Sequence, residues 1–171
     1  MSYFKEYRKT DKIRNTSRYS LRLLFWFRKF HASSFFFAKC FYKTMFWLVS
    51  KRHGMEIGIR TKIGKGLYIG HPFNITINSG TIIGDNCNIH KNRLIGQENR
   101  GSRKGTPTLG NCVWVGANAV IVGNINIGDD VLISPNSFVN QDIPSHSIVF
   151  GNPCIIKHRD NATEYYINNR V

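Results

Sequence analysis

The chain has 171 residues, enough for one domain with a short appendage, and it carries 24 Lys or Arg against 10 Asp or Glu. Its hydrophobic content of 42% is ordinary for a globular protein and, at this length, allows a real core. The longest uncharged stretch in the first 53 positions is residues 31–38, which is far too short for a membrane-spanning helix.

The excess positive charge is concentrated at the N-terminus. Residues 1–53 hold 13 Lys or Arg, only 2 acidic residues and 15 of the 22 aromatic residues. The rest of the chain holds 11 basic and 8 acidic residues. We therefore divide the chain into a basic, aromatic segment (1–54) and a nearly balanced body.

Two helices are predicted in the first segment, at residues 18–30 and 35–52. In the second, an apolar face follows helical spacing, and its members are Phe35, Ala38, Phe41 or Tyr42, Met45 and Val49. Two interpretations stay open: the helices pack against the body or a neighbouring subunit, or residues 1–53 form an interfacial membrane anchor whose cations face anionic lipid. No binding motif indicates a nucleic-acid partner.

The body, residues 55–150, is built on a repeat of six residues. Aliphatic residues recur at positions 57, 63 and 69, again at 83, 89 and 95 after a two-residue slip at 75–77, and then at 109, 115, 121, 127, 133 and 139. Glycine often follows, and we expect it to adopt corner dihedrals that a Cβ would resist. A period of six fits neither a helix nor an alternating strand. It predicts an all-β fold, a left-handed parallel β-helix of hexapeptide repeats in which three flat faces make a coil of about 18 residues.

The repeat pauses between Ile95 and Leu109. We expect a protruding loop at residues 97–108 that adds two residues to an otherwise regular twelve-residue spacing. After Ile143 the pattern ends, and residues 151–171 are expected to form a C-terminal cap and tail.

Four cysteines, at positions 40, 87, 112 and 154, make no CxxC pair and no zinc-ligand spacing with histidine. Together with the absence of a leader-like apolar start, this indicates free thiols and a cytoplasmic location, at the inner face of the membrane if residues 1–53 bind lipid.

Several motifs carry a resemblance to a known family. The hexapeptide arrays, the GLYIGH segment, GTPTLGNCVWVGANAVIVGN and the closing VFGNPCIIK resemble the serine acetyltransferase-like branch of hexapeptide acyltransferases, over roughly residues 55–157. Within that branch, the NRGSRKGTPT loop looks most like the O-acetyltransferases of capsule and exopolysaccharide clusters. The resemblance implies a homotrimer, with acetyl-CoA lying between neighbouring subunits as the donor.

The resemblance also implies catalytic residues. The catalytic His of the family aligns with His71, and its acidic partner aligns with Glu56, where serine acetyltransferases usually have Asp. A second His of serine acetyltransferases aligns with Thr106. An imidazole suits the removal of an alcohol proton near neutral pH, and a carboxylate can orient it.

Coenzyme A is a long anion, so basic groups and backbone amides should meet it. By resemblance its arm passes Gly116, Ala117, Ser134 and Pro135, and its phosphate or adenine end lies near Gly151, Asn152, Pro153 and Lys157. On the loop, Arg100, Arg103 and Lys104 are candidates to bind coenzyme A or an acidic acceptor.

Our leading expectation is acetyl transfer to a hydroxyl of a surface polysaccharide or its lipid-linked precursor, by direct attack on the thioester. The alternatives are a serine O-acetyltransferase of cysteine biosynthesis and an inactive β-helix scaffold. His71 and His90 lie 19 residues apart, close to one coil, but a metal site of the hexapeptide type needs a third His, so no metal is expected.

Overall fold

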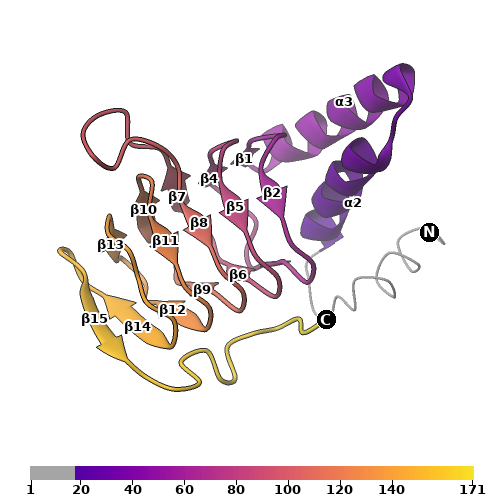
Figure 1. Ribbon diagram of the computed structural model, residues 1–171. Helices are drawn as coiled ribbons and strands as arrows, with labels where there is room; N and C mark the ends of the chain where they lie inside the picture. Colours follow the sequence, from indigo (N-terminus) through magenta and orange to yellow (C-terminus); the bar gives the residue numbers. More distant parts are fainter. Residues whose placement is uncertain (1–17) are drawn as a thin grey trace.

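The computed structural model describes residues 18–171 and shows a three-sided parallel β-helix with a helical hairpin at one end (Figure 1). Residues 1–17, the start of the predicted basic segment, lie outside the described residues. The predicted fold class is confirmed. Three sheets form the faces, and consecutive strands of the chain go to successive faces.

Each sheet stacks one short strand per coil, in parallel. Sheet A contains β1 (Glu56–Ile57), β4 (Ile75–Ile77), β7 (Arg93–Gly96), β10 (Val120–Val122) and β13 (Phe138–Val139). Sheet B contains β2 (Lys62–Ile63), β5 (Ile82–Ile83), β8 (Thr108–Leu109) and β11 (Asn126–Ile127). Sheet C contains β3 (Tyr68–Ile69), β6 (Asn88–Ile89), β9 (Trp114–Val115), β12 (Val131–Ile133), β14 (Ser147–Phe150) and β15 (Ile155–His158), of which only β15 is antiparallel.

The core is a set of aliphatic columns inside the prism. In sheet C the register pairs Ile69, Ile89, Val115, Ile133 and Val149 in turn, and each is at most 1% exposed. The inward residue of one coil therefore packs on its equivalents in the coils on either side. A single coil has almost no apolar volume to pack against, so stability comes from stacking.

Two irregularities depart from 18-residue spacing, and both matter for the site. Ile69 pairs with Ile89, 20 residues on, whereas Ile77 pairs with Ile95, 18 residues on, so the first coil is widened by two residues between Ile69 and Ile77. Ile95 pairs with Ile121, 26 residues on. The loop after β7 therefore adds eight residues, and our count of two was wrong, because Leu109 belongs to the next face and not to the one after it.

The expected reason for the glycines after the inward residues also needs correction. Left-handed backbone at the corners falls mostly on other residues, such as Asn92, Asn118 and Asn136, with φ of 55°, 59° and 60°. Asn tolerates this region better than most side chains. A Cβ on Gly84 would instead lie 2.4 Å from the Gly110 carbonyl oxygen of the next coil, so close stacking of coils requires the glycine there.

The helix α2 (Arg18–Ala32) covers the first coil. It buries Leu23, Leu24 and Phe27, and its polar side chains bond to carbonyl groups of that coil. Arg28 donates to the carbonyls of Ile63 (2.6 Å) and Gly64, the Ser20 hydroxyl donates to Ile69 (3.1 Å), and His31 Nε2 lies 2.8 Å from the Ile59 oxygen. The first coil has no coil before it, so α2 protects its open strand edges.

The helix α3 (Phe36–Arg52) returns antiparallel to α2 and leads directly into β1 (Figure 1). In residues 18–171 no helix combines the length and apolar character needed to cross a membrane.

The C-terminal tail folds back along the prism after β15. Its hydrogen bonds reach successively earlier coils: Thr163 to Asp130, the Tyr166 carbonyl to Asn88, and Val171 to Asn86. The tail thus runs from the last coil toward the first, along the edge where sheets B and C meet (Figure 1).

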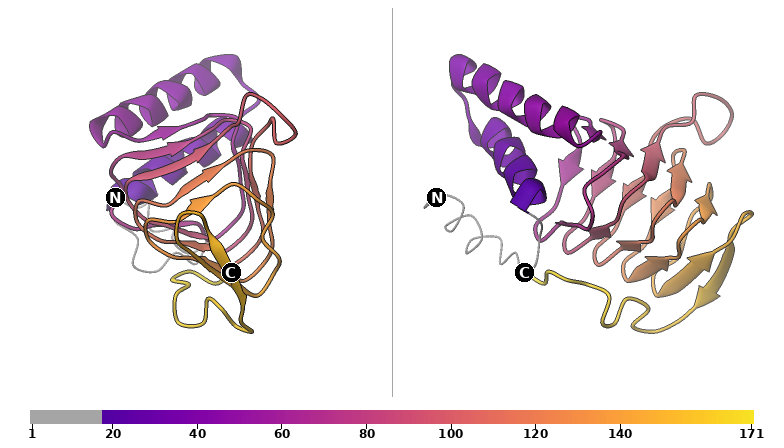
Figure 2. Two further views of the ribbon diagram at one scale, coloured as in Figure 1. Left: turned by 90° about the vertical axis from the view of Figure 1, so that its left-hand side faces the viewer. Right: turned by 180° about the vertical axis from the view of Figure 1, so that it is seen from behind.

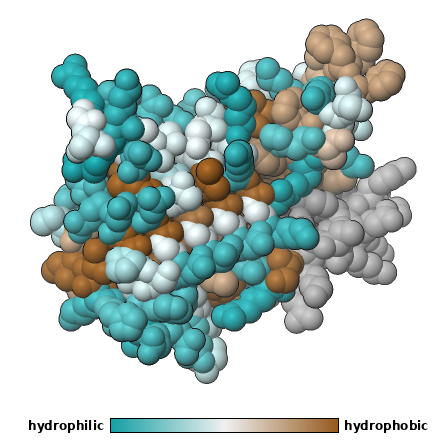
Figure 3. Space-filling model, viewed as in Figure 1, coloured by the Kyte–Doolittle hydropathy of each residue, from teal (hydrophilic) through white to brown (hydrophobic). Residues whose placement is uncertain are grey.

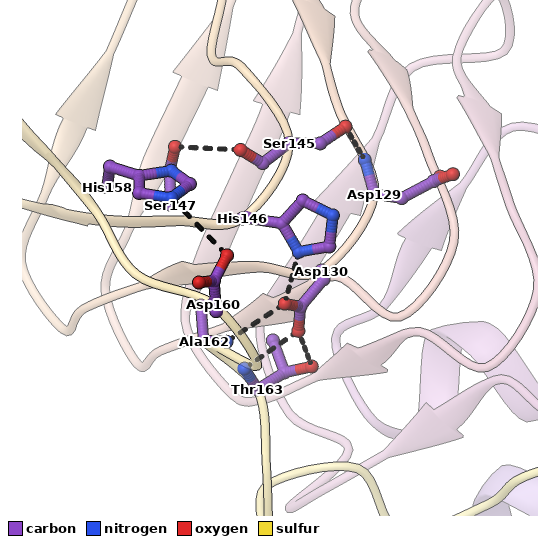
Figure 4. Close-up of polar contacts among 9 residues, drawn as sticks. All are labelled: Asp129, Asp130, Ser145, His146, Ser147, His158, Asp160, Ala162 and Thr163. Carbon is purple, nitrogen blue, oxygen red and sulfur yellow. Dashed lines mark hydrogen bonds and ion pairs between the residues drawn. The ribbon is translucent and has the colours of Figure 1, made fainter.

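Asp130 fastens the start of the tail (Figure 4). Its carboxylate accepts hydrogen bonds from the Thr163 hydroxyl (2.6 Å), the Thr163 and Ala162 N–H groups (both 2.9 Å) and His146 Nδ1 (2.9 Å). Burial alone would raise its pKa, but the hydrogen bonds outweigh burial and hold the pKa of Asp130 below its ordinary value.

The inward and outward positions of one strand test the core. Ile83 is 2% exposed and Ile82 is 37% exposed, although they are neighbours in β5. Ile83→Ala should lower the free energy of unfolding by about 2–5 kcal/mol, whereas Ile82→Ala should change it by less than about 1 kcal/mol. Denaturant unfolding measures both, and equal losses would contradict the inward column.

The Asp130 contact predicts a pH-dependent tail. Because the folded pKa is depressed, the contribution is complete above the ordinary carboxyl pKa of about 4 and is lost as pH falls through the lower folded value. Asp130→Asn should speed amide exchange at Ala162 and Thr163 near neutral pH. The control is Asp160→Asn, whose side chain is 84% exposed. Unchanged exchange in Asp130→Asn would show that other contacts hold the tail.

Candidate active site

His71 lies in the widened part of the first coil, at the corner between sheets C and A. It follows β3, has a left-handed φ of 53°, and its carbonyl accepts a hydrogen bond of 2.8 Å from Phe73 N–H. The extra residues let the chain make this turn before β4 begins, and the imidazole is exposed. The location suits a residue that must meet a substrate from solvent.

Glu56 begins β1 on the same coil and faces Thr76 of β4 across sheet A. Its side chain is exposed as well. In the described part of the chain no hydrogen bond or ion pair joins it to His71, so its orienting role stays a prediction.

His90 lies one coil away from His71 on the same corner. A Cβ on Gly70, the residue before His71, would lie 2.8 Å from His90 Nδ1. The His90 ring packs against Trp114, with centroids 4.9 Å apart, and against Tyr68. Burial first, then the charges of Arg93 and His71, lowers the pKa of His90 to about 4. His90 is therefore neutral at pH 7 and presents no charge to His71 there.

Arg93 lies inside the corner and was not singled out by the sequence. It pairs with Ile75 and precedes the inward Ile95 by two positions, so it faces the interior and is 3% exposed. Its guanidinium donates to the Gly116 carbonyl at 2.5 Å, and burial lowers its pKa to about 9. Arginine at an inward strand position was the signal that could have identified it.

The residues predicted to bind the coenzyme A arm come together at this corner. The Gly116 N–H donates to the Ile133 carbonyl at 2.7 Å, and a Cβ on Gly116 would lie 2.4 Å from the Pro135 nitrogen. Ser134 N–H in turn donates to Val149 at 2.8 Å. Gly116 and Ala117 of one coil thus stack directly on Ser134 and Pro135 of the next.

The segment predicted for the phosphate or adenine end continues the same line. Gly151, Asn152 and Pro153 form the turn between β14 and β15, and the Gly151 carbonyl accepts a hydrogen bond from Phe138 N–H (3.0 Å). Lys157 is exposed on β15, with Nζ 5.7 Å from the centre of the Phe150 ring. One corner of the prism therefore carries, in order along its axis, His71, His90, Gly116, Ser134 and Gly151.

The protruding loop leaves a different corner, between β7 of sheet A and β8 of sheet B (Figure 2). An antiparallel bridge between Glu98 and Gly105 closes its base, and Arg103 Nε pairs with Glu98 Oε2 at 3.1 Å. Arg100 and Lys104 are exposed, and Thr106 lies half-buried against Gly80. Within one chain, a full face of the prism separates the loop from the His71 corner.

Among residues 18–171 no group of three His, Cys, Asp or Glu side chains could hold a metal ion. The four cysteines are free thiols, and burial raises the pKa of Cys87 to about 12, which keeps it protonated.

The repeat and the corner define a class of protein. Residues 106–141 match the family described as "Bacterial transferase hexapeptide (six repeats)".

Particular relatives are more specific. The chain is 39% identical over 109 residues to a serine acetyltransferase of Synechococcus elongatus, covering 64% of this chain and 45% of that protein. It is 42% identical over 98 residues to a serine acetyltransferase of Helicobacter pylori, covering 57% of each. The chain thus spans about half the length of these curated relatives.

A solved structure agrees. Serine acetyltransferase isoform 3 of Entamoeba histolytica, in complex with cysteine, superposes with a TM-score of 0.66 at 26% identity, covering 84% of this chain and 50% of that one. These relatives overturn our expectation of an O-acetyltransferase acting on a capsule or exopolysaccharide glycan, which was wrong. They favour the serine alternative.

The glycine at the corner provides a test of the stacking. Gly116→Ala would press a Cβ onto the backbone of Pro135, so we expect a loss of about 1–3 kcal/mol in unfolding free energy and weaker binding of coenzyme A. Gly96→Ala is the control, because its Cβ would meet only the flexible end of Leu94 at 3.2 Å. Thermal unfolding and calorimetric titration with coenzyme A measure both effects. Equal behaviour of the two variants would contradict the tight corner.

Proposed function

We propose that this chain is a serine O-acetyltransferase that uses acetyl-CoA as its donor. The observation that carries the proposal is its 39–42% identity to two serine acetyltransferases over about 100 residues. The corner described above supports it, because an exposed imidazole stands at one end of a line of closely stacked backbone.

In this proposal His71 is the general base. Its imidazole takes the proton from the serine hydroxyl while the oxygen attacks the thioester carbonyl of acetyl-CoA. Collapse of the tetrahedral intermediate breaks the C–S bond and releases coenzyme A, which takes up a proton, and O-acetylserine. Neutral His90 beside it adds no charge that would oppose protonation of His71 during the reaction. Glu56 has the role of steadying the charged imidazole.

Coenzyme A is placed along the corner. Its arm follows Gly116, Ala117, Ser134 and Pro135, where the absence of a side chain on Gly116 permits close approach to the backbone. Its phosphates meet the turn of Gly151, Asn152 and Pro153 and the ammonium group of Lys157.

A homotrimer accounts for the loop. Hexapeptide β-helices have flat faces that suit packing against copies of themselves, and sites at such contacts draw on two chains. The loop and the His71 corner lie at opposite edges of sheet A, so a neighbour's loop can meet the corner that the chain's own loop does not reach. In that arrangement Thr106, Arg100, Arg103 and Lys104 approach the bound substrates from the adjacent subunit.

Removing the base tests the mechanism. His71→Ala should lower kcat for L-serine-dependent release of coenzyme A by about 10²–10⁴-fold, with coenzyme A affinity nearly unchanged. Glu56→Gln should lose less, and the double variant should be no worse than His71→Ala, because the two groups act as a unit. The control is His158→Ala, an exposed histidine on β15.

Two results would contradict this proposal. Near wild-type turnover in His71→Ala would remove His71 from the mechanism. Wild-type protein that binds coenzyme A but releases none from acetyl-CoA with L-serine would favour an inactive scaffold.

The loop cations give a separate prediction. Arg100→Ala/Lys104→Ala leaves the Arg103–Glu98 pair intact and should raise the KM for acetyl-CoA several-fold, with a weaker dependence on salt. Arg60→Ala/Lys62→Ala, two exposed cations on the first coil, is the control.

Unchanged KM across a salt series would return Arg100 and Lys104 to a solvated role. A fully active, stable monomer in sedimentation experiments would contradict the shared site.

A further inference from the structure

The two N-terminal helices divide their surfaces unequally. α2 buries Leu23, Leu24 and Phe27 against the prism and α3. In α3 only Phe46 and Ser50 are buried, although the helix has 17 residues and many aromatic side chains. α3 therefore contributes little to the core relative to its apolar content.

The opposite side of α3 is an exposed aromatic face, and its large apolar side chains are 49–78% exposed among the described residues. They are Phe35, Phe36, Phe37, Phe41, Trp47 and Leu48. Three of the phenylalanines are consecutive and lie at the tip of the hairpin, which points away from the prism (Figure 2). Figure 3 shows the light-brown patch of this tip at the upper right. A contiguous patch of this kind marks an interaction site.

Charge decides which partner fits. Residues 18–52 contain eight Lys or Arg and no Asp or Glu. Lys43 and Lys51 lie on the exposed side, among the aromatic residues, and Lys39 is half-buried near the tip. A second copy docking through the same face would bring like charges together with no acidic partner, which is unfavourable. A surface that offers both apolar depth and negative charge satisfies every group on the face.

We propose that the exposed aromatic face of α3 docks on the surface of an anionic phospholipid bilayer. The phenylalanines and Trp47 enter the boundary between headgroups and acyl chains, and the lysines meet the lipid phosphates. The helix lies in the interface and does not span it, since α3 is too short and too charged to cross. α2 holds α3 to the first coil, so the prism hangs beside the membrane. This binding does not depend on the acetyl-transfer proposal.

The experiment is co-sedimentation of the full chain with vesicles of phosphatidylcholine alone or mixed with phosphatidylglycerol, at low and high salt. We expect binding to the anionic vesicles that weakens with salt and little binding to neutral ones. Phe35→Ser/Phe36→Ser/Phe37→Ser and, separately, Lys39→Gln/Lys43→Gln should each lower the partition coefficient about tenfold or more. All three phenylalanines are more than 70% exposed, so the triple variant should keep its melting temperature.

Matched controls carry the same changes elsewhere. Ile155→Ser/Tyr165→Ser removes exposed apolar groups from β15 and the tail, and Lys62→Gln/Lys65→Gln removes exposed cations from the first coil. Both should bind vesicles as the wild type does. No binding to anionic vesicles at low salt overturns the proposal. Equal losses in the control variants overturn it too, as does a change of oligomeric state in the triple variant without any change in vesicle binding.

Discussion

The structure depends on one constraint: an aliphatic side chain must point inward at every sixth residue and lie on its equivalent in the next coil. No coil has a core of its own, so each is stable only when its neighbours supply one. The columns through Ile69, Ile89, Val115 and Ile133 meet this requirement with side chains at most 1% exposed. Where the stack begins, α2 takes the place of the missing coil and bonds to the free carbonyl groups.

The candidate site follows from the same constraint. Because the register is fixed, residues from five different coils fall on one corner, although His71 and Gly151 are far apart in the sequence. The two-residue widening of the first coil interrupts the regular turn where His71 lies, and the eight-residue loop leaves a neighbouring corner. Both insertions leave the inward columns intact, so function was added where the stacking does not constrain the chain.

Much of this was predictable from the sequence. The spacing of aliphatic residues alone gave the β-helix, and the motifs around His71 and Gly116 identified a corner whose members the structure brings together. The loop length was misjudged because two aliphatic residues, Ile95 and Leu109, fit two different numbers of repeat steps. The glycines were assigned to dihedral strain, whereas Gly84 and Gly116 answer a contact between coils that only coordinates reveal.

The remaining errors have a similar cause. Arg93 and the neutral state of His90 depend on burial across coils, which the linear pattern does not express. The acceptor was assigned from the composition of one loop. A solvent-exposed loop carries few constraints from the fold, and identity spread over about 100 residues proved the better guide.

The central claim is that acetyl-CoA lies along the corner from Gly151 to Gly116 and delivers its acetyl group at His71. A crystal structure of the assembled protein with coenzyme A and L-serine tests it most directly. The account predicts the coenzyme A arm beside Gly116 and Ser134, with the serine hydroxyl about 2.6–3.2 Å from an imidazole nitrogen of His71. Coenzyme A bound on another edge of the prism, or serine bound away from His71, would contradict it.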